Sequence, residues 1–264
     1  MIYSRQISGR PVPQIHYERQ GHVVLITLEG DTDLNLGTVD DELYARLLEY
    51  RDDDELRCAV ISGAGDKAFC AGADLKRTQD RGFPSFWAPR ALTLLTGLDF
   101  YKPLVAAVNG YCMGTGFMLA LACDVRLATE TAAFALPEVK YGFPPGQGAT
   151  QRLPRALPMG LAMQLLLTGD RLVGEDALRW GLVNKLVAPE QLIPEAMALA
   201  ERIAANPPLA VRATKEMVLR GADMSIEAGV RLGNMLSALT RQSEDFQEGM
   251  RAFAEKRPPL FKGR

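Results

Sequence analysis

The sequence is short of the side chains that most often build metal centres and covalent catalytic sites. Among 264 residues it has two histidines, His16 and His22, and four cysteines without a C-x-x-C spacing. Histidine and closely spaced cysteine are the usual zinc ligands, and a nucleophilic serine or cysteine needs a base beside it. We therefore expect no metal site, no disulfide framework and no histidine-based triad. Cys70, although it lies in a glycine-bearing turn, is interpreted as a packed thiol.

A strong charge of one sign and long apolar runs are also missing. The formal net charge is −2, which gives no general basic field for nucleic acid. No stretch approaches the roughly 20 apolar residues of a membrane span, and the first residues have no apolar core of the kind a secretory signal needs. We therefore expect a cytoplasmic protein that binds neither nucleic acid nor membrane.

The apolar pattern divides the chain into two regions. Up to about residue 190, short apolar runs alternate with helical periodicity, which indicates an α/β core. Beyond it the pattern is helical, with breaks at Asn-Pro-Pro and Gly-Ala-Asp. We predict a core domain at 1–190 and a helical region at 191–264. The predicted strands are 23–28, 58–62, 104–108 and 125–128, and the predicted helices are 40–50, 86–98, a buried helix after Gly116, 191–205, 209–220 and 226–254.

Two glycine-bearing turns are the most informative feature of the chain. They have the sequences AFCAGADLK at 68–76 and NGYCMGTG at 109–116, and each follows a short apolar strand and leads into a helical stretch. The first N–H groups of a helix have no partner within it, so they can bind a negative oxygen that approaches across glycine. Each turn by itself is also consistent with an ordinary tight turn. Together with an acidic residue downstream, Glu138, they predict an oxyanion hole and a base that form an enolate.

Further motifs extend this pattern. They are ALACDVR at 120–126, LPE at 136–138, PGQGATQRL at 145–153, LTGD at 167–170, WGLVN at 180–184 and FAEKR at 253–257. In their order and spacing, from about residue 23 to 262, the motifs resemble the enoyl-CoA hydratase/isomerase (crotonase) superfamily. The resemblance implies a spiral of repeated ββα units carrying an acyl-CoA site. It also implies C-terminal helices that cover the site and assemble a homotrimer or a dimer of trimers.

The resemblance also assigns site residues. The backbone N–H groups of Ala73 and Thr115 correspond to the oxyanion donors, and Glu138 to a catalytic acid/base. The family usually has glycine where this chain has Thr115, so the β-branched side chain alters the pocket beside the acyl group. CoA is implied as part of the substrate and no other cofactor is expected. Contacts with CoA and substrate are assigned to Ala71, Asp74, Leu75, Lys76, Phe261 and Lys262, the last two across a subunit boundary.

The second acid of the family's hydratases is missing. Its position holds Met118, which cannot carry a proton, so the two-carboxylate hydration mechanism is not available in its usual form. One glutamate suffices for isomerisation of a Δ3 to a Δ2 enoyl-CoA, which is the simplest prediction. Two alternatives stay open: a hydratase with a non-standard second acid/base, for which Tyr111 and Tyr141 are candidates, and an acyl-CoA-binding protein without turnover.

The surroundings of these residues predict two further properties. Apolar neighbours of Glu138 should desolvate its carboxylate and raise its pKa. Apolar residues of the C-terminal helices, among them Met235 and Leu239, either cover the inner face of their own subunit or meet a partner. The walls of the acyl pocket are expected to include Phe83, Phe86, Trp87 and Ala91.

Overall fold

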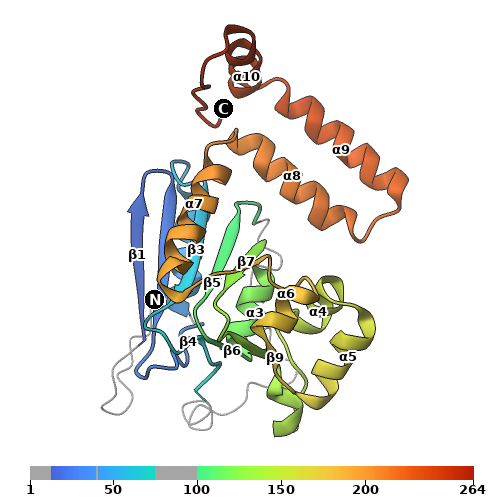
Figure 1. Ribbon diagram of the computed structural model, residues 1–264. Helices are drawn as coiled ribbons and strands as arrows, with labels where there is room; N and C mark the ends of the chain where they lie inside the picture. Colours follow the sequence, from blue (N-terminus) through green and yellow to red (C-terminus); the bar gives the residue numbers. More distant parts are fainter. Residues whose placement is uncertain (1–12, 40, 75–99) are drawn as a thin grey trace.

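The structure is a computed structural model that describes residues 13–39, 41–74 and 100–264 (Figure 1). Within these ranges two sheets pack with helices into an α/β core, and a group of helices follows. The α/β expectation is therefore confirmed, while the helix predicted at 86–98 lies outside the described residues. The four predicted strands form within one residue of their expected ends, as β2 (Val23–Glu29), β3 (Cys58–Gly63), β5 (Leu104–Val108) and β7 (Val125–Ala128).

The larger sheet has the strand order β1-β2-β3-β5-β7-β10. β1 (Gln14–Gln20) forms an antiparallel hairpin with β2, and the later pairings are parallel, ending with β10 (Lys185–Leu186). All six residues of β3 are buried. A strand that is buried along its whole length is typical of a parallel sheet covered on both faces, and helices do cover both faces of this one.

The smaller sheet has the order β4-β6-β8-β9 and is built from strands of two or three residues. Successive strands alternate between the sheets, since β3 is followed by β4, β5 by β6 and β7 by β8. This alternation is the expected ββα spiral, which is confirmed. The bounds are β4 (Ala68–Cys70), β6 (Tyr111–Met113), β8 (Ala133–Ala135) and β9 (Leu172–Val173).

Helices cover the sheets on both sides. One cluster of buried residues lies between the two sheets and includes side chains of α1 (Asp41–Asp52) and α3 (Thr115–Ala122). On the other face of the larger sheet, α7 (Leu192–Ala204) packs against β3 and β5, so the first helix of the predicted C-terminal region belongs to the core. The remaining core helices are the 3-10 helices η1 (Pro137–Tyr141) and η2 (Pro189–Gln191), with α4 (Ala149–Ala156), α5 (Met159–Thr168) and α6 (Gly174–Arg179).

Beyond α7 the chain leaves the core as a helical arm of three helices, α8 (Pro208–Gly221), α9 (Ile226–Thr240) and α10 (Glu244–Glu255) (Figure 1). The prediction of one continuous helix over 226–254 is wrong. Ser243 caps α10 by accepting a hydrogen bond from the Phe246 N–H at 3.1 Å, and this cap separates α10 from α9. Among the described residues, no helix is both long and apolar enough to cross a membrane.

The end of the chain is tied to α10. The buried carboxylate of Asp245 accepts hydrogen bonds from the N–H groups of Lys262 at 2.6 Å and Gly263 at 2.8 Å. Arg257 forms a two-pronged pair with Glu248 at 2.6 and 3.0 Å. These bonds fix the path of the last residues although their side chains are largely exposed.

Candidate active site

The candidate site forms where three strands of the smaller sheet end together. β4, β6 and β8 run parallel, with Cys70 opposite Cys112 and Met113 opposite Ala135. Parallel strands direct their carboxyl ends to the same edge of a sheet. The residues that follow each strand are the two glycine-bearing turns and Glu138, so segments separated by more than 60 positions in the sequence lie side by side.

The two turns touch through their glycines. A β-carbon built on Gly114 would lie 3.7 Å from the Gly72 Cα and only 3.1 Å from Oε1 of Glu138. Gly72 and Gly114 have φ angles of 110° and 51°, which favour glycine on conformational grounds as well. The donors expected from the sequence, the N–H groups of Ala73 and Thr115, directly follow these glycines. Both predicted donors therefore flank the point where the turns meet, and Glu138 lies beside it.

α3 supplies the second donor from its first turn. Its helical hydrogen bonds begin with the Met118 N–H, which donates to the Gly114 carbonyl at 2.9 Å, so the N–H groups before it are free of the helix ladder. Thr115 is not among the residues with positive φ, and the backbone there accepts a β-branched side chain without strain. Gly116 packs so tightly that a β-carbon would lie 2.1 Å from the Cys70 carbonyl oxygen. This contact fixes α3 against the end of β4.

Glu138 is a buried carboxylate with little compensation. Its residue is 6% exposed, and Oε2 has no hydrogen-bond partner among the described residues. Burial raises the pKa of Glu138 above its ordinary value of 4.5, because desolvation disfavours the charged form. Pro137 begins the short helix that carries it, and a buried strand, β8, leads into that helix. The burial of Glu138 and the direction of its pKa shift agree with the expectation.

Met118 lies on the buried side of α3 and is 3% exposed. It supplies no ionisable group to the site. The two tyrosines considered as helpers have other surroundings. Tyr111 begins β6, at the opposite end of the strand from Gly114, and Arg171 lies over its ring at 5.2 Å. Tyr141 ends η1 and is 62% exposed.

The predicted contacts with CoA fall into three groups. Ala71 and Asp74 lie in the first turn, where the Ala71 N–H donates to the Leu34 carbonyl at 2.9 Å. Leu75 and Lys76 lie outside the described residues, as do the expected pocket walls Phe83, Phe86, Trp87 and Ala91. Phe261 and Lys262 form the third group, and they lie far from the glycine-bearing turns within the chain.

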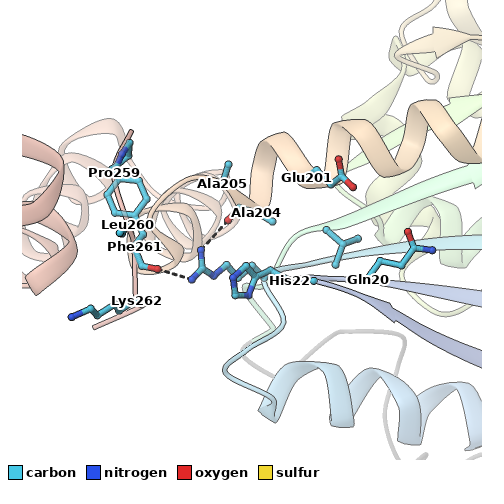
Figure 2. A pocket seen from close by; sticks show the side chains of 12 residues that line it. Gln20, His22, Glu201, Ala204, Ala205, Pro259, Leu260, Phe261 and Lys262 are labelled. Atoms are coloured by element: carbon cyan, nitrogen blue, oxygen red, sulfur yellow. Dashed lines mark hydrogen bonds between the residues drawn. The ribbon is translucent and has the colours of Figure 1, made fainter. Parts of the chain in front are cut away.

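That third group lines a pocket of about 660 Å³ at the start of the larger sheet (Figure 2). Arg57, just before β3, donates hydrogen bonds to the Phe261 carbonyl at 2.7 Å and the Ala204 carbonyl at 3.2 Å. The candidate hole lies instead at the carboxyl ends of the strands. The structure therefore does not bring Phe261 or Lys262 together with Glu138 in a single chain, and contact across a subunit boundary stays a prediction.

No cysteine pairs with a histidine to form a nucleophile and its base among the described residues, although Cys70 lies beside the first turn. Cys70 is completely buried, and burial raises the pKa of its thiol. His16 pairs with Glu29, and His22 bonds to the Glu55 carbonyl at 2.7 Å, both in or beside the first hairpin. No group of three or more potential metal ligands gathers in the ranges that the structure describes.

One element of the site was missed from the sequence. The loop at 30–38 lies beside the first turn, and the Gly37 N–H donates to the Gly72 carbonyl at 2.9 Å. The signal for a turn, GDTDLNLG at 30–37, was present in the sequence. Nothing in that signal connects it to a turn some 35 positions later, because the hydrogen bond between Gly37 and Gly72 joins two backbone groups.

Comparison with known proteins places this chain in one family. The model of the enoyl-CoA hydratase/isomerase family matches residues 18–264. The chain is 40% identical to the (E)-benzylidenesuccinyl-CoA hydratase of Thauera aromatica over 252 residues, which are 93% of this chain and 98% of that protein. It is 41% identical to the carnitinyl-CoA dehydratase of Citrobacter koseri, over 95% of this chain and 98% of that one.

Solved structures agree with this assignment. The enoyl-CoA hydratase of Bacillus anthracis superimposes with a TM-score of 0.86 at 35% identity, covering 95% of this chain and 99% of that one. The enoyl-CoA hydratase EchA1 of Mycobacterium marinum gives 0.85 at 37% identity, covering 96% of this chain and all of its own. The chain therefore belongs to the enoyl-CoA hydratase/isomerase family.

Proposed function

We propose that this protein moves a proton on an acyl-CoA thioester with Glu138 as the single acid/base, most simply converting a Δ3 to a Δ2 enoyl-CoA. The observation that supports it most is the pairing of Glu138 with Met118. One is a buried carboxylate beside the meeting point of the two turns, with one oxygen that has no hydrogen-bond partner among the described residues, and the other is a thioether buried in the core. A single acid/base is suited to a reaction that removes a proton and returns the same proton elsewhere.

The proposed reaction has two proton transfers. The thioester oxygen accepts hydrogen bonds from the N–H groups of Ala73 and Thr115. The Glu138 carboxylate takes a proton from C2, and the electron pair of that C–H bond enters the conjugated enolate, whose charge rests on the thioester oxygen. Glu138 then returns the proton to C4, so the double bond moves from C3–C4 to C2–C3. Each donor aimed at the developing charge contributes about 3 kcal/mol.

The environment of Glu138 suits this role. Burial raises its pKa, which makes the carboxylate a stronger base than an exposed glutamate. A base whose pKa is closer to the working pH exchanges protons more efficiently in both directions. The proposal requires no resident cofactor, because CoA arrives with the substrate and leaves with the product.

A second candidate is hydration of a Δ2 enoyl-CoA, with another group in place of the missing acid. It is favoured by the names of the similar proteins, which include a hydratase and a dehydratase. The environments of Tyr111 and Tyr141 do not favour either of them as that group. Acyl-CoA binding without turnover is the third candidate. In that case, replacing Glu138 would change no reaction.

We also propose that the chain works as a homotrimer or a dimer of trimers. The helical arm leaves apolar side chains uncovered, with Ile226 89% and Phe253 84% exposed. Exposed apolar surface of this kind is typical of a surface that meets a partner. Phe261 and Lys262, fixed at the far end of the larger sheet, would then reach the CoA of a neighbouring subunit.

The test is incubation with a Δ3 enoyl-CoA and, separately, a Δ2 enoyl-CoA in D2O. Chromatography against the authentic esters distinguishes the two isomers, and mass identifies a hydrated product or incorporated deuterium. We expect the Δ3 ester to convert to the Δ2 ester, without a hydrated product. Glu138→Gln should lower the rate by about a hundredfold or more, since removal of a general acid/base typically costs that much. Glu130→Gln, which removes the charge of an exposed glutamate, is the matched control and should leave the rate unchanged.

Each other outcome has a distinct meaning. A hydrated product would show that the protein is a hydratase and not an isomerase. Binding of both esters without conversion would support a binding protein. Full activity of Glu138→Gln would show that the base has been assigned to the wrong residue.

A further inference from the structure

We infer that the loop at 30–38 is a positioning element for the first oxyanion donor, acting through the Gly37 N–H and held by Asn35. The inference rests on the proposed function, because it concerns how the Ala73 N–H is aimed at the thioester oxygen. It assigns a role to residues outside both glycine-bearing turns.

One peptide unit, between Gly72 and Ala73, connects the loop to the first donor. The Gly72 carbonyl and the Ala73 N–H belong to the same peptide bond, which is planar and trans, so they point in opposite directions. The Gly37 N–H donates to that carbonyl at 2.9 Å. A hydrogen bond that fixes the carbonyl therefore fixes the direction of the N–H on the other side of the plane. It also polarises the peptide and strengthens the N–H as a donor.

In the second turn the carbonyl of the donor peptide also accepts a backbone hydrogen bond, but the N–H comes from a helix. There the peptide that carries the Thr115 N–H has the Gly114 carbonyl, which accepts from the Met118 N–H of α3 at 2.9 Å. One donor peptide is thus held by the hydrogen bond that begins a helix, and the other by a loop from an earlier part of the chain. A second bond, from the Ala71 N–H to the Leu34 carbonyl at 2.9 Å, ties the same loop to the first turn.

Asn35 fixes the loop itself. It is 2% exposed and has a φ of 50°, a left-handed conformation that asparagine tolerates better than most residues. Its Nδ2 donates to the carbonyls of Ala64 at 2.9 Å and Ala68 at 2.7 Å, and its Oδ1 accepts from the Gly30 N–H at 3.2 Å. Two of these bonds hold the loop to Ala64 and to the first residue of β4, and the third closes the loop on itself.

Gly37 offers a clean way to disturb the loop. Its φ is +70°, and a β-carbon there would have its nearest neighbour, Cβ of Asp74, at 3.9 Å. Space is therefore available at the β-carbon position, and a substitution acts through backbone conformation. Valine is strongly disfavoured at positive φ because it is β-branched, whereas asparagine, of similar size, is tolerated. Gly37→Val and Gly37→Asn form a matched pair.

The measurement is the infrared carbonyl stretch of a bound saturated acyl-CoA labelled with 13C at the thioester carbon. Saturated acyl-CoA esters of increasing chain length are first compared for binding, and the ester that binds most tightly is then labelled. Hydrogen bonds to the thioester oxygen lower this frequency, so it reports the hole without turnover. We expect Gly37→Val to reduce the shift and to lower kcat by about tenfold or more, with little change in KM, because a poorly aimed donor is lost chiefly in the transition state. Gly37→Asn should recover most of both.

Asn35→Ala removes the side-chain bonds that hold the loop. Like Gly37→Val, it should reduce the carbonyl shift and lower kcat. Tyr50→Phe is its stability control, since it removes a buried hydrogen bond to the Pro103 carbonyl on another part of the core. It should lower the thermal midpoint without changing kcat or the carbonyl frequency. Wild-type frequency in Gly37→Val, or equal effects of valine and asparagine at position 37, would overturn the inference.

The same spectra separate this inference from the proposed function. If the thioester carbonyl of the wild-type complex shows no shift on binding, the oxyanion hole itself is wrong. If the wild-type complex shows the shift and the loop variants keep it, the hole stands and only the positioning role fails.

Discussion

The strands of the core and helix α9 of the arm differ in how far they bury their apolar residues within the chain. In the core, whole strands such as β3 and β5 are buried, and α3 is buried along most of its length. In the arm, α9 buries none of its residues within the chain, and Met235 and Leu239 are 66% and 63% exposed. These core elements therefore bury their apolar residues within the chain, whereas α9 has the kind of surface that meets a partner.

Because of this difference, substitutions in the core and in the arm should affect activity by different routes. A disturbance of the core should change the geometry of the site directly, because close packing transmits small shifts. A disturbance of the arm should change the assembly first and the chemistry only through it. Three predictions test this division.

The largest effect is expected from Gly116→Ala in the core. The new β-carbon would lie 2.1 Å from the Cys70 carbonyl oxygen, so α3 must move away from β4 and carry the Thr115 N–H with it. A displacement of about 1 Å in a catalytic group can cost about a hundredfold in rate, and overpacking costs about 1–3 kcal/mol of stability. Turnover of an enoyl-CoA and the thermal midpoint check both effects.

The control is Gly160→Ala in α5, where a β-carbon would have no neighbour within 4 Å. It should leave the rate unchanged and stabilise the helix slightly, since alanine favours helix more than glycine. A Gly116→Ala protein with normal rate and stability would show that the contact between α3 and β4 is softer than the packing implies.

An intermediate effect is expected from Met235→Glu combined with Leu239→Glu in the arm. Charges placed in an apolar interface are desolvated on association, so subunit affinity should fall by about a hundredfold or more. Sedimentation velocity checks the assembly, and circular dichroism should show an intact core. Asn234→Glu, an exposed polar position on the same helix, is the matched control. If the double variant assembles like the wild type, the partner meets another face of the arm.

The smallest effect concerns pH and Glu138. Because burial raises the pKa of Glu138 above 4.5, the acid limb of kcat/KM should lie above that value. The folded state prefers the neutral acid, so this contribution to stability is fully present below the unfolded pKa and is lost as pH rises through the folded pKa. Glu138→Gln should therefore gain stability relative to the wild type as pH rises towards neutrality. Denaturant unfolding at several pH values checks the trend, and a difference independent of pH would contradict it.

Much of the core and of the site could be predicted because their signals are local. The buried strands have continuous apolar runs, and the glycines of the two turns mark places where the backbone needs positive φ or close approach, as at Gly72 and Gly116. Glu138 could be singled out because an acid follows an apolar segment and a proline. Its burial and raised pKa follow from those neighbours.

The features that escaped prediction depend on contacts between distant segments. Strands of two or three residues, such as β8 and β9, are too short to show a period and exist because neighbouring strands pair with them. The break between α9 and α10 depends on the cap at Ser243, which the apolar periodicity on either side conceals. The role of Asn35 depends on carbonyls about 30 positions away.

The main-chain character of both proposed donors has a consequence for mutational scanning. The residue at position 73 is already alanine, and Thr115→Ala keeps its N–H, so an alanine scan would pass over the hole without recording it. The positions that a scan would register instead are the glycines around it, whose replacement alters the path of the backbone. In a map of mutational tolerance, the sensitive positions should therefore be these glycines, together with Glu138.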